Sequence, residues 1–253
     1  MKISILTIFP EMFLSPFSES IIKRALQKKL VNISIIDIRS FTKDKHRSVD
    51  DYSYGGGPGM VLKPGPIVEA IESIKAKKNK QTSGKIILTS AQGKVFNQDM
   101  AKKLLEEKEI IFICGRYEGI DERVRHILKA EEVSIGDYVT TGGEIPVMVM
   151  VDVLVRMIPG VLGKEESMVN DSFYNGLLDY PHFTRPEKYM GYEVPDILLS
   201  GDHEKIDKWR KKQSLIETIK KRPDLLINRK FTKEEIRILN ELKTDKNEKK
   251  GKQ

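Results

Sequence analysis

Residues 111–163 constrain the fold of this chain more than any other stretch, because they join apolar runs to clustered glycines. One apolar run ends in Cys-Gly-Arg-Tyr-Glu-Gly at residues 114–119. A second cluster, Ser-Ile-Gly-Asp-Tyr-Val-Thr-Thr-Gly-Gly-Glu at residues 134–144, precedes an almost wholly apolar run. Glycine at the end of a buried strand lets the backbone approach a ligand closely, because no Cβ stands in the way. We therefore expect a ligand pocket where these strands end.

Strand-like and helix-like segments alternate along residues 1–162. Residues 2–9 form a continuous apolar run, which is typical of a strand buried on both faces. Residues 146–158 predict a helix that is apolar nearly all round and therefore covered on several sides. The alternation predicts an α/β domain with a mostly parallel sheet flanked by helices. Further strands are predicted at residues 33–38, 86–89, 110–114 and 133–135, further helices at 18–29, 64–77, 97–107 and 121–128, and a loop up to residue 63.

The character of the chain changes after residue 162. Residues 163–175 are polar and without periodicity, so we expect a flexible linker between two domains. Residues 176–243 predict a small, basic, all-α domain with helices at 203–221 and 232–243. The second helix opens with Thr232 and Glu235 at the spacing of a capping box. Residues 244–253 are rich in lysine and predict a disordered tail.

The composition limits the class of protein. A formal net charge of +7 favours a polyanionic partner. Cys114 is the only cysteine, which excludes an intrachain disulfide framework and suits a reducing cytosol. The four histidines and this cysteine do not cluster at metal-ligand spacing, so we expect no metal site. The apolar N-terminal run is too short to cross a membrane, and we expect a cytoplasmic protein.

Several motifs leave two interpretations open. Residues 54–60 (Tyr-Gly-Gly-Gly-Pro-Gly-Met) lack the endings of a phosphate-binding loop or a dinucleotide fingerprint, so they form either a flexible surface loop or a site where RNA or a ligand approaches. Asp152 and Arg156, four apart on an apolar helix, suit a structural ion pair. Asp171 on its own suits a helix cap or a linker carboxylate.

Three glycine-containing segments together favour a binding site over surface turns. Residues 89–93, 114–119 and 135–143 each follow a predicted parallel strand. Ligands of open α/β sheets bind beyond the carboxyl ends of the strands. We therefore expect the three segments to form one site.

Taken in order, these segments resemble the bacterial tRNA (guanine-N1)-methyltransferases, a family of the knotted SPOUT class. The resemblance runs from residue 1 to about residue 242, with matching order and spacing. It is carried by residues 7–13, 54–60, 114–123, 134–144, 158–163, 171–173, 176–179, 182–186 and 209–214.

The resemblance implies a fold and a reaction. The sheet domain would contain a deep trefoil knot, an exception to the rule that chains do not thread loops. S-adenosylmethionine would lie bent within the knot, and the helical domain would bind tRNA. The active site would combine one subunit of a homodimer with the linker and helical domain of the other. The methyl acceptor would be the guanine at nucleotide 37 of tRNA, beside the anticodon and preceded by another guanine.

The resemblance also gives individual residues roles. Asp171 matches the proposed general base that takes the proton from guanine N1, and Arg156 matches the residue that stabilises charge on guanine O6. An assisting Mg²⁺ ion is a further implication. The implied cofactor-binding residues are Ser90, Ala91, Gln92, Gly93, Gly115, Arg116, Tyr117, Glu118, Ile135, Gly136, Tyr138, Val139, Thr140, Gly142, Gly143 and Pro146. The implied substrate-binding residues are Gly57, Gly59, Asp152, Ser172, Asp179, His182 and Arg185.

The chain departs from the family pattern in the first cofactor segment. Ala91 stands where the family usually has proline, which would loosen the free segment and weaken cofactor binding. Two rival functions are a knotted enzyme that methylates a ribose hydroxyl and a non-enzymatic basic RNA-binding module. Asp171 within Asp-Ser-Phe argues against the first, and the three glycine-containing segments argue against the second.

Overall fold

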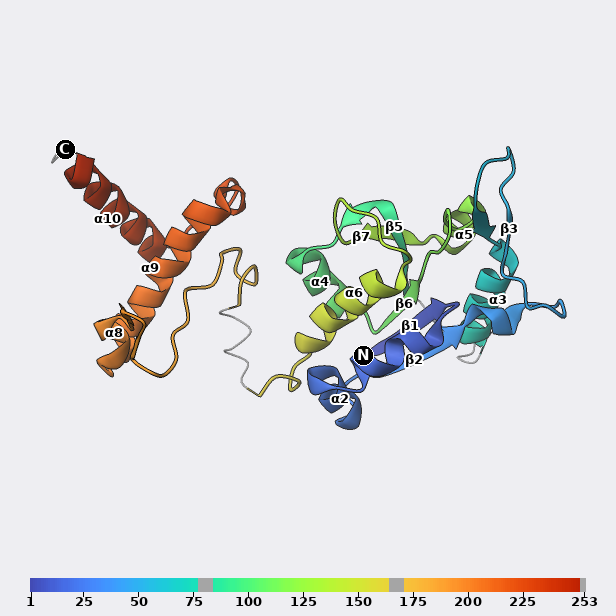
Figure 1. The fold of residues 1–253 in the computed structure, drawn as a ribbon, viewed down its shortest axis with the longest axis horizontal. Helices are drawn as coiled ribbons and strands as arrows, with labels where there is room; N and C mark the ends of the chain where they lie inside the picture. The colour runs from blue at the N-terminus through green and yellow to red at the C-terminus, as the bar shows by residue number, and fades with distance from the viewer. Residues whose placement is uncertain (77–83, 164–170, 251–253) are drawn as a thin grey trace. The chain divides into compact units, whose positions relative to one another are not determined.

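The computed structural model describes residues 1–76, 84–163 and 171–250, with side chains described as far as residue 244. The chain divides into two compact units, Met1–Glu165 and Glu166–Gln253, which are coloured blue to yellow and orange to red in Figure 1. The division falls within the predicted linker, residues 163–175. Residues 164–170 of that linker lie outside the described residues.

Unit 1 is built around a five-stranded sheet in the order β2-β1-β6-β5-β7. Every strand pairing in this sheet is parallel, and β6 is buried along its whole length. The parallel sheet of the predicted α/β domain is therefore confirmed. The strands are β1 (Lys2–Thr7), β2 (Asn32–Asp37), β5 (Lys85–Val95), β6 (Glu109–Ile113) and β7 (Glu131–Ser134).

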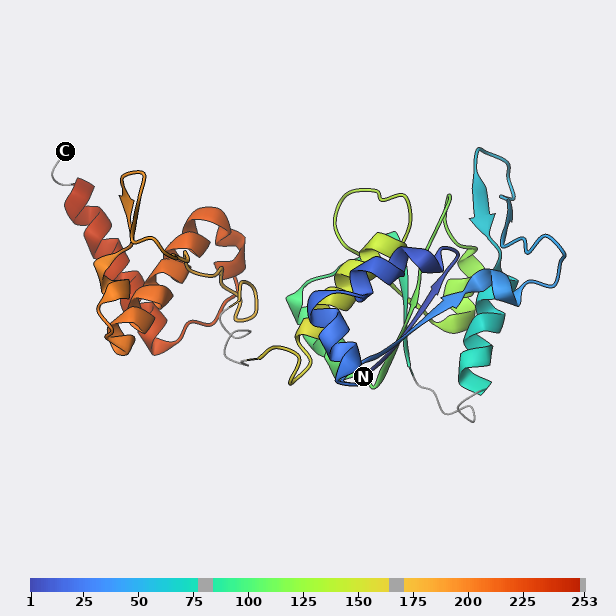
Figure 2. The same cartoon turned by 60° about the horizontal axis from the view of Figure 1, so that its bottom comes forward.

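Helices cover both faces of this sheet. Figure 2 shows α3 and α5 on one side and α2, α4 and α6 on the other. Local capping fixes several helix starts: Asn97 accepts a hydrogen bond from Met100 N at 2.9 Å, and Asp121 accepts one from Arg123 N at 2.9 Å. The helices are α1 (Leu14–Phe17), α2 (Ser20–Gln27), α3 (Pro64–Ala76), α4 (Gln98–Leu105), α5 (Glu122–Leu128) and α6 (Glu144–Arg156), with 3-10 turns η1 (Pro10–Phe13) and η2 (Ile38–Phe41).

The region predicted as a loop before residue 63 contains a short antiparallel hairpin, β3 (Asp50–Tyr52) and β4 (Met60–Leu62). Aspartate and glycine are poor strand formers, so the local sequence gave no strand signal. The pairing has a tertiary origin, because Leu62 N donates to Gly119 O at 3.0 Å and ties β4 to another part of the unit.

Strand β5 is longer than predicted and changes register. Thr89 and Lys94 both pair with Val133 of β7, so residues 90–93 bulge out of the ladder. The first predicted cofactor segment is therefore a bulge within a strand and not a loop after one.

The expectation that α6 is covered on several sides is confirmed, because the helix packs against α2, α4 and η1 and seven of its thirteen residues are buried. One face is left uncovered. Ile145 is 45% exposed and Val149 is 42% exposed, and Asp152 is exposed one turn further along. One apolar face of this helix therefore meets solvent.

Unit 2 contains two long helices around a small core formed by Leu177, Leu215 and Ile238. Two short strands, β8 and β9, form an antiparallel hairpin, so the expectation of an all-α domain is wrong. Helix α10 continues to Lys250, so the segment predicted as disordered from residue 244 is helical over most of its length. The elements are β8 (Lys188–Tyr189), β9 (Tyr192–Glu193), α8 (Asp196–Leu199), α9 (His203–Lys221), η3 (Pro223–Leu226) and α10 (Lys233–Lys250).

Within the described residues, none of the helices has the length and apolar character needed to cross a bilayer.

The predicted capping box at the start of α10 is confirmed. Thr232 N donates to Glu235 Oε2 at 2.7 Å, and Glu235 N donates to Thr232 Oγ1 at 3.2 Å. The other carboxylate oxygen of Glu235 accepts a bond from Arg229 Nη2 at 2.8 Å. Burial acts to raise the pKa of Glu235, but the hydrogen bonds from Thr232 and Arg229 outweigh it and lower that pKa.

We predict that Glu235→Ala lowers the free energy of unfolding of unit 2 by about 1–3 kcal/mol, because it removes a helix cap and the partner of a buried guanidinium. Trp209, the only tryptophan, reports unfolding of this unit by fluorescence in urea. Glu234→Ala removes a half-exposed pair with Lys211 and should cost less than about 1 kcal/mol.

The same carboxylate makes the stability of unit 2 depend on pH. Folding lowers the pKa of Glu235. Its ionised carboxylate therefore contributes fully to the free energy of unfolding above the ordinary glutamate pKa of about 4.3, and this contribution is lost as the pH falls through the lower pKa of the folded state. In Glu235→Gln, the free energy of unfolding of unit 2 should therefore fall less steeply as the pH is lowered below about 4.3. The same pH dependence in wild type and variant would contradict this role of Glu235.

Candidate active site

A cavity of about 320 Å³ lies beside the bulge of β5 and the carboxyl ends of β6 and β7. Each of the three predicted cofactor segments contributes to its lining. Of the residues implied to bind the cofactor, only Gly93 and Gly136 do not line it. Its volume is within the usual range for small-molecule sites. The structure thus brings the three segments together at one place.

Backbone contacts between glycines hold these segments together. Gly143 N donates to Gly115 O at 2.7 Å, and Gly115 N donates to the hydroxyl of Thr89 at 3.1 Å. A Cβ on Gly143 would lie 2.7 Å from Gly115 N and 2.8 Å from the Cα of Cys114. Only glycine fits at residue 143, because two segments of the chain pass each other there with their backbones in contact.

Glu144, which the sequence did not single out, is a central charge of this region. It is 1% exposed at the first turn of α6. It accepts a hydrogen bond from Thr7 Oγ1 at 2.8 Å and an ion pair from Arg116 Nε at 3.3 Å. Arg116 Nη1 also donates to Thr141 O at 2.8 Å. Arg116 lines the cavity, and its Nε and Nη1 groups clamp the second segment to the third and to the start of α6.

Cys114 lies beneath this clamp and is buried. Burial raises the pKa of its thiol well above the usual range, and the carboxylate of Glu144 adds to the effect. A thiol held in its protonated form is a poor nucleophile. The cysteine therefore has a packing role.

The two predicted cofactor glycines outside the lining support the cavity walls. A Cβ on Gly93 would lie 2.7 Å from Glu132 O of the neighbouring strand. Gly136 has a φ of +147°, and the ring of Tyr138 lies against it. The Tyr138 hydroxyl donates to Ile135 O at 3.1 Å and closes this turn.

The glycine-rich hairpin β3–β4 is bonded directly to the cavity wall. Glu118 N donates to Met60 O at 3.0 Å. Gly59 has a φ of +86° and faces the side chain of Glu118, while Gly57 has a φ of +112° with nothing within 4 Å of its Cβ position. The predicted substrate residues Gly57 and Gly59 therefore lie on an element joined to the predicted cofactor site.

Asp152 and Arg156 lie on α6, which begins at the cavity. Asp152 is exposed, and Arg156 is half-buried in the last turn of the helix. Both residues belong to unit 1, whereas Asp171 belongs to unit 2.

In unit 2, three predicted substrate residues form one linked group. Asp179 N donates to Ser172 Oγ at 2.9 Å, and the Asp179 carboxylate pairs with His182 Nε2 at 2.8 Å. Leu178 N donates to Thr218 Oγ1 at 2.9 Å, which fastens the segment to α9. The exposed Arg185 lies outside this group.

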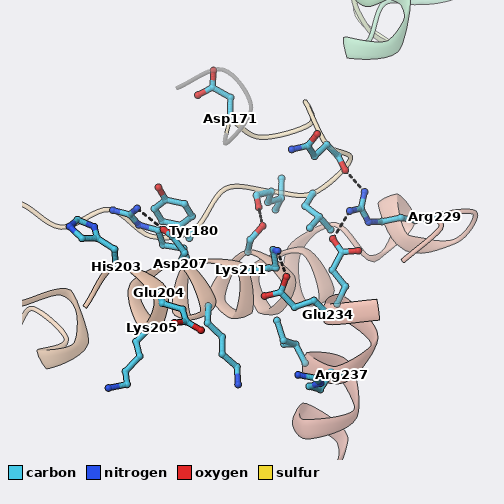
Figure 3. A pocket seen from close by; sticks show the side chains of 18 residues that line it. Asp171, Tyr180, His203, Glu204, Lys205, Asp207, Lys211, Arg229, Glu234 and Arg237 are labelled. Carbon is cyan, nitrogen blue, oxygen red and sulfur yellow. Dashed lines mark hydrogen bonds and ion pairs between the residues drawn. The ribbon is translucent and has the colours of Figure 1, made fainter. Parts of the chain in front are cut away.

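Asp171, half-buried, lines a groove of about 1110 Å³ within unit 2 (Figure 3). Figure 3 shows it on the segment that passes over α9, with Lys211 and Arg229 among the labelled side chains below. Arg210 pairs with Asp207 at 3.2 Å and lies 5.2 Å from the ring centre of Tyr180. Burial raises the pKa of the Tyr180 hydroxyl above its ordinary value.

Among the side chains that the structure describes, no three histidine, cysteine, aspartate or glutamate residues converge as metal ligands.

We predict that Gly143→Ala destabilises unit 1 by about 2 kcal/mol or more and abolishes binding of S-adenosylmethionine, because the added methyl group would collide with the Thr89 hydroxyl and the backbone of Cys114 and Gly115. Thermal unfolding by circular dichroism and isothermal titration calorimetry measure the two effects. Gly65→Ala is the matched control, since nothing lies within 4 Å of its Cβ position. Equal behaviour of the two variants would contradict the role of the glycine contact.

Comparison with known proteins identifies the family. The family model for tRNA (Guanine-1)-methyltransferase TrmD matches residues 1–228. A tRNA (guanine-N(1)-)-methyltransferase of Desulforamulus reducens is 54% identical over 242 residues, covering 96% of this chain and 95% of that protein. Proteins with the same description are 52% identical in Dictyoglomus turgidum, covering 97% and 98%, and 50% identical in Bacillus cereus, covering 97% and 100%. The chain therefore belongs to the tRNA (guanine-1)-methyltransferase family.

Proposed function

We propose that the three segments around the cavity of unit 1 bind S-adenosylmethionine and that unit 2 presents the tRNA. The protein transfers a methyl group from S-adenosylmethionine to N1 of the guanine at nucleotide 37 of tRNA. The observation that carries this function is the family match over residues 1–228 combined with the convergence of the predicted segments on one cavity. The proposal places the enzyme in the cytoplasm, together with its tRNA substrate.

The cavity suits a cofactor with polar ends. Gly115, Gly142 and Gly143 line the cavity without side chains, and Tyr117 and Tyr138 add aromatic rings to its lining. When bound, S-adenosylmethionine would supply a sulfonium methyl group: the nucleophile attacks the methyl carbon in line with the C–S bond, which breaks, and S-adenosylhomocysteine leaves with the electron pair. The contribution of these residues is to hold the donor in place, since positioning lowers the barrier of such a displacement.

The remaining chemistry is proton removal. Guanine N1 carries a proton and becomes a nucleophile only when that proton leaves. Asp171 is the proposed general base, and Arg156 stabilises the negative charge that develops on O6. Ser172, Asp179 and His182, already linked by hydrogen bonds, support the base outside the RNA stack. No step of this proposal uses Mg²⁺, because the described side chains offer no metal-ligand cluster.

The proposal includes a trefoil knot in unit 1. The close passage of Gly143 against Gly115 supports it, as does the bond between Thr7 and Glu144, which lie 137 positions apart. These contacts bring the end of β1 and the chain segments after β6 and β7 close together.

The proposal also includes a homodimer. The exposed apolar side chains of Ile145 and Val149 lie on α6, and Leu14 is exposed on α1. Helix α6 also contacts η1, the turn that leads into α1. An apolar surface of this kind suits a second copy of the chain. The active site then combines Arg156 of one subunit with Asp171 of the other.

The activity is tested with labelled S-adenosylmethionine and two tRNA transcripts that carry guanine or adenine at nucleotide 37. We predict label at guanine N1, no label in the adenine transcript, and a loss of at least about 100-fold with Asp171→Asn, because general-base catalysis contributes roughly 10²- to 10⁴-fold. Equal labelling of both transcripts would refute the guanine assignment and favour a ribose-methylating enzyme.

The shared active site is tested by mixing two inactive variants. In a dimer of Asp171→Asn and Arg156→Ala subunits, one site carries both defects and the other carries neither. Random mixing should therefore restore about a quarter of wild-type activity. Sites built within one subunit would each keep a defect, so an inactive mixture of demonstrated mixed dimers would contradict the shared site.

A further inference from the structure

Two tyrosines of the β3–β4 hairpin have no packing role in the chain. Tyr52 is 80% exposed and Tyr54 is 99% exposed. Four glycines follow them at positive φ, at residues 55, 56, 57 and 59, so the hairpin tip carries almost no other side-chain bulk. Two aromatic rings presented this way form an accessible flat surface.

The position of the hairpin relates this surface to the candidate active site. Met60 O accepts a bond from Glu118 N, and Leu62 N donates to Gly119 O, both at 3.0 Å. Glu118 and Gly119 line the cavity. The tyrosines therefore project from an element whose base is part of the cavity wall.

The charges around the tyrosines favour bases over phosphates as the occupant. Asp50 and Asp51 lie on the same strand, and the Tyr52 N–H and Lys63 hold the pKa of the Asp51 carboxyl below its usual range. Carboxylates repel phosphates, whereas an aromatic ring stacks on any uncharged base.

Cations suited to the RNA backbone lie in the preceding loop. Lys43, Lys45 and Arg47 are all exposed, and Figures 1 and 2 both show this loop and the hairpin projecting from the same end of unit 1. Cations beside a stacking surface are the usual arrangement of sites for single-stranded RNA.

Methylation at N1 requires the guanine to leave its stack, because N1 lies on the pairing edge of the base. The base that follows the guanine then loses a stacking neighbour. We propose that Tyr54, together with Tyr52, stacks on this unpaired base of the anticodon loop and holds the loop open beside the cavity. This inference rests on the proposed function, since it takes the same RNA as substrate.

The experiment compares Tyr54→Leu with Tyr54→Phe in the full chain, because the two variants differ chiefly in the presence of a ring. The probe is an anticodon stem-loop RNA with guanine at nucleotide 37 and the fluorescent base 2-aminopurine in the next position. Binding is measured with S-adenosylhomocysteine present, alongside KM and kcat with tRNA. Because Tyr54 is 99% exposed, neither variant should change the melting temperature.

We expect Tyr54→Phe to match wild type, with quenched 2-aminopurine in the complex. Tyr54→Leu should bind the RNA about tenfold more weakly, raise KM for tRNA, and leave the 2-aminopurine several-fold brighter. Identical affinity and fluorescence for all three proteins would overturn the proposal. Both readouts are independent of methyl transfer, so a wild type that binds the RNA without methylating it would refute the proposed function and not the stacking.

Discussion

The cavity of unit 1 depends on one backbone contact, the hydrogen bond of 2.7 Å from Gly143 N to Gly115 O. It joins the segment after β6 to the segment after β7. The hydroxyl of Thr89 joins β5 to the first of these segments, because it donates to Ile113 O and accepts from Gly115 N. The buried carboxylate of Glu144 then fixes Arg116 across the same gap. A buried charge pair of this kind adds specificity of geometry more surely than it adds stability. The walls of the cavity are consequently preformed.

Sequence reasoning located these segments but not the contacts that join them. Glycine and polar residues after apolar runs mark the carboxyl ends of parallel strands, and such ends meet at one edge of a sheet. The partnership of Thr7 with Glu144 spans 137 positions and depends on how the chain is threaded, so no local pattern reveals it. The β3–β4 hairpin was missed for a similar reason, because its strands are stabilised by the segment around Gly119 and not by their own propensities.

In unit 2, the sequence predicts correctly those features that depend on residues close together in the chain. The capping box of Thr232 and Glu235 needs only three residues of spacing, and the structure shows both of its hydrogen bonds. The β8–β9 hairpin is short, with Met190 and Gly191 at positive φ in its turn, and its proline-rich surroundings concealed it. A shared substrate-binding role for Ser172, Asp179 and His182 is implied only by family resemblance, and the hydrogen bonds between them carry no sequence signal, since single polar residues in an irregular segment form no pattern.

The most direct test of this account is hydrogen–deuterium exchange with and without S-adenosylmethionine. If the cavity is the cofactor site, residues 88–93, 115–119 and 135–143 should all exchange more slowly when the cofactor is bound, because their backbone groups form its walls. The segment around Asp179 should change less. Slower exchange confined to unit 2, with none in the three cavity segments, would contradict the account.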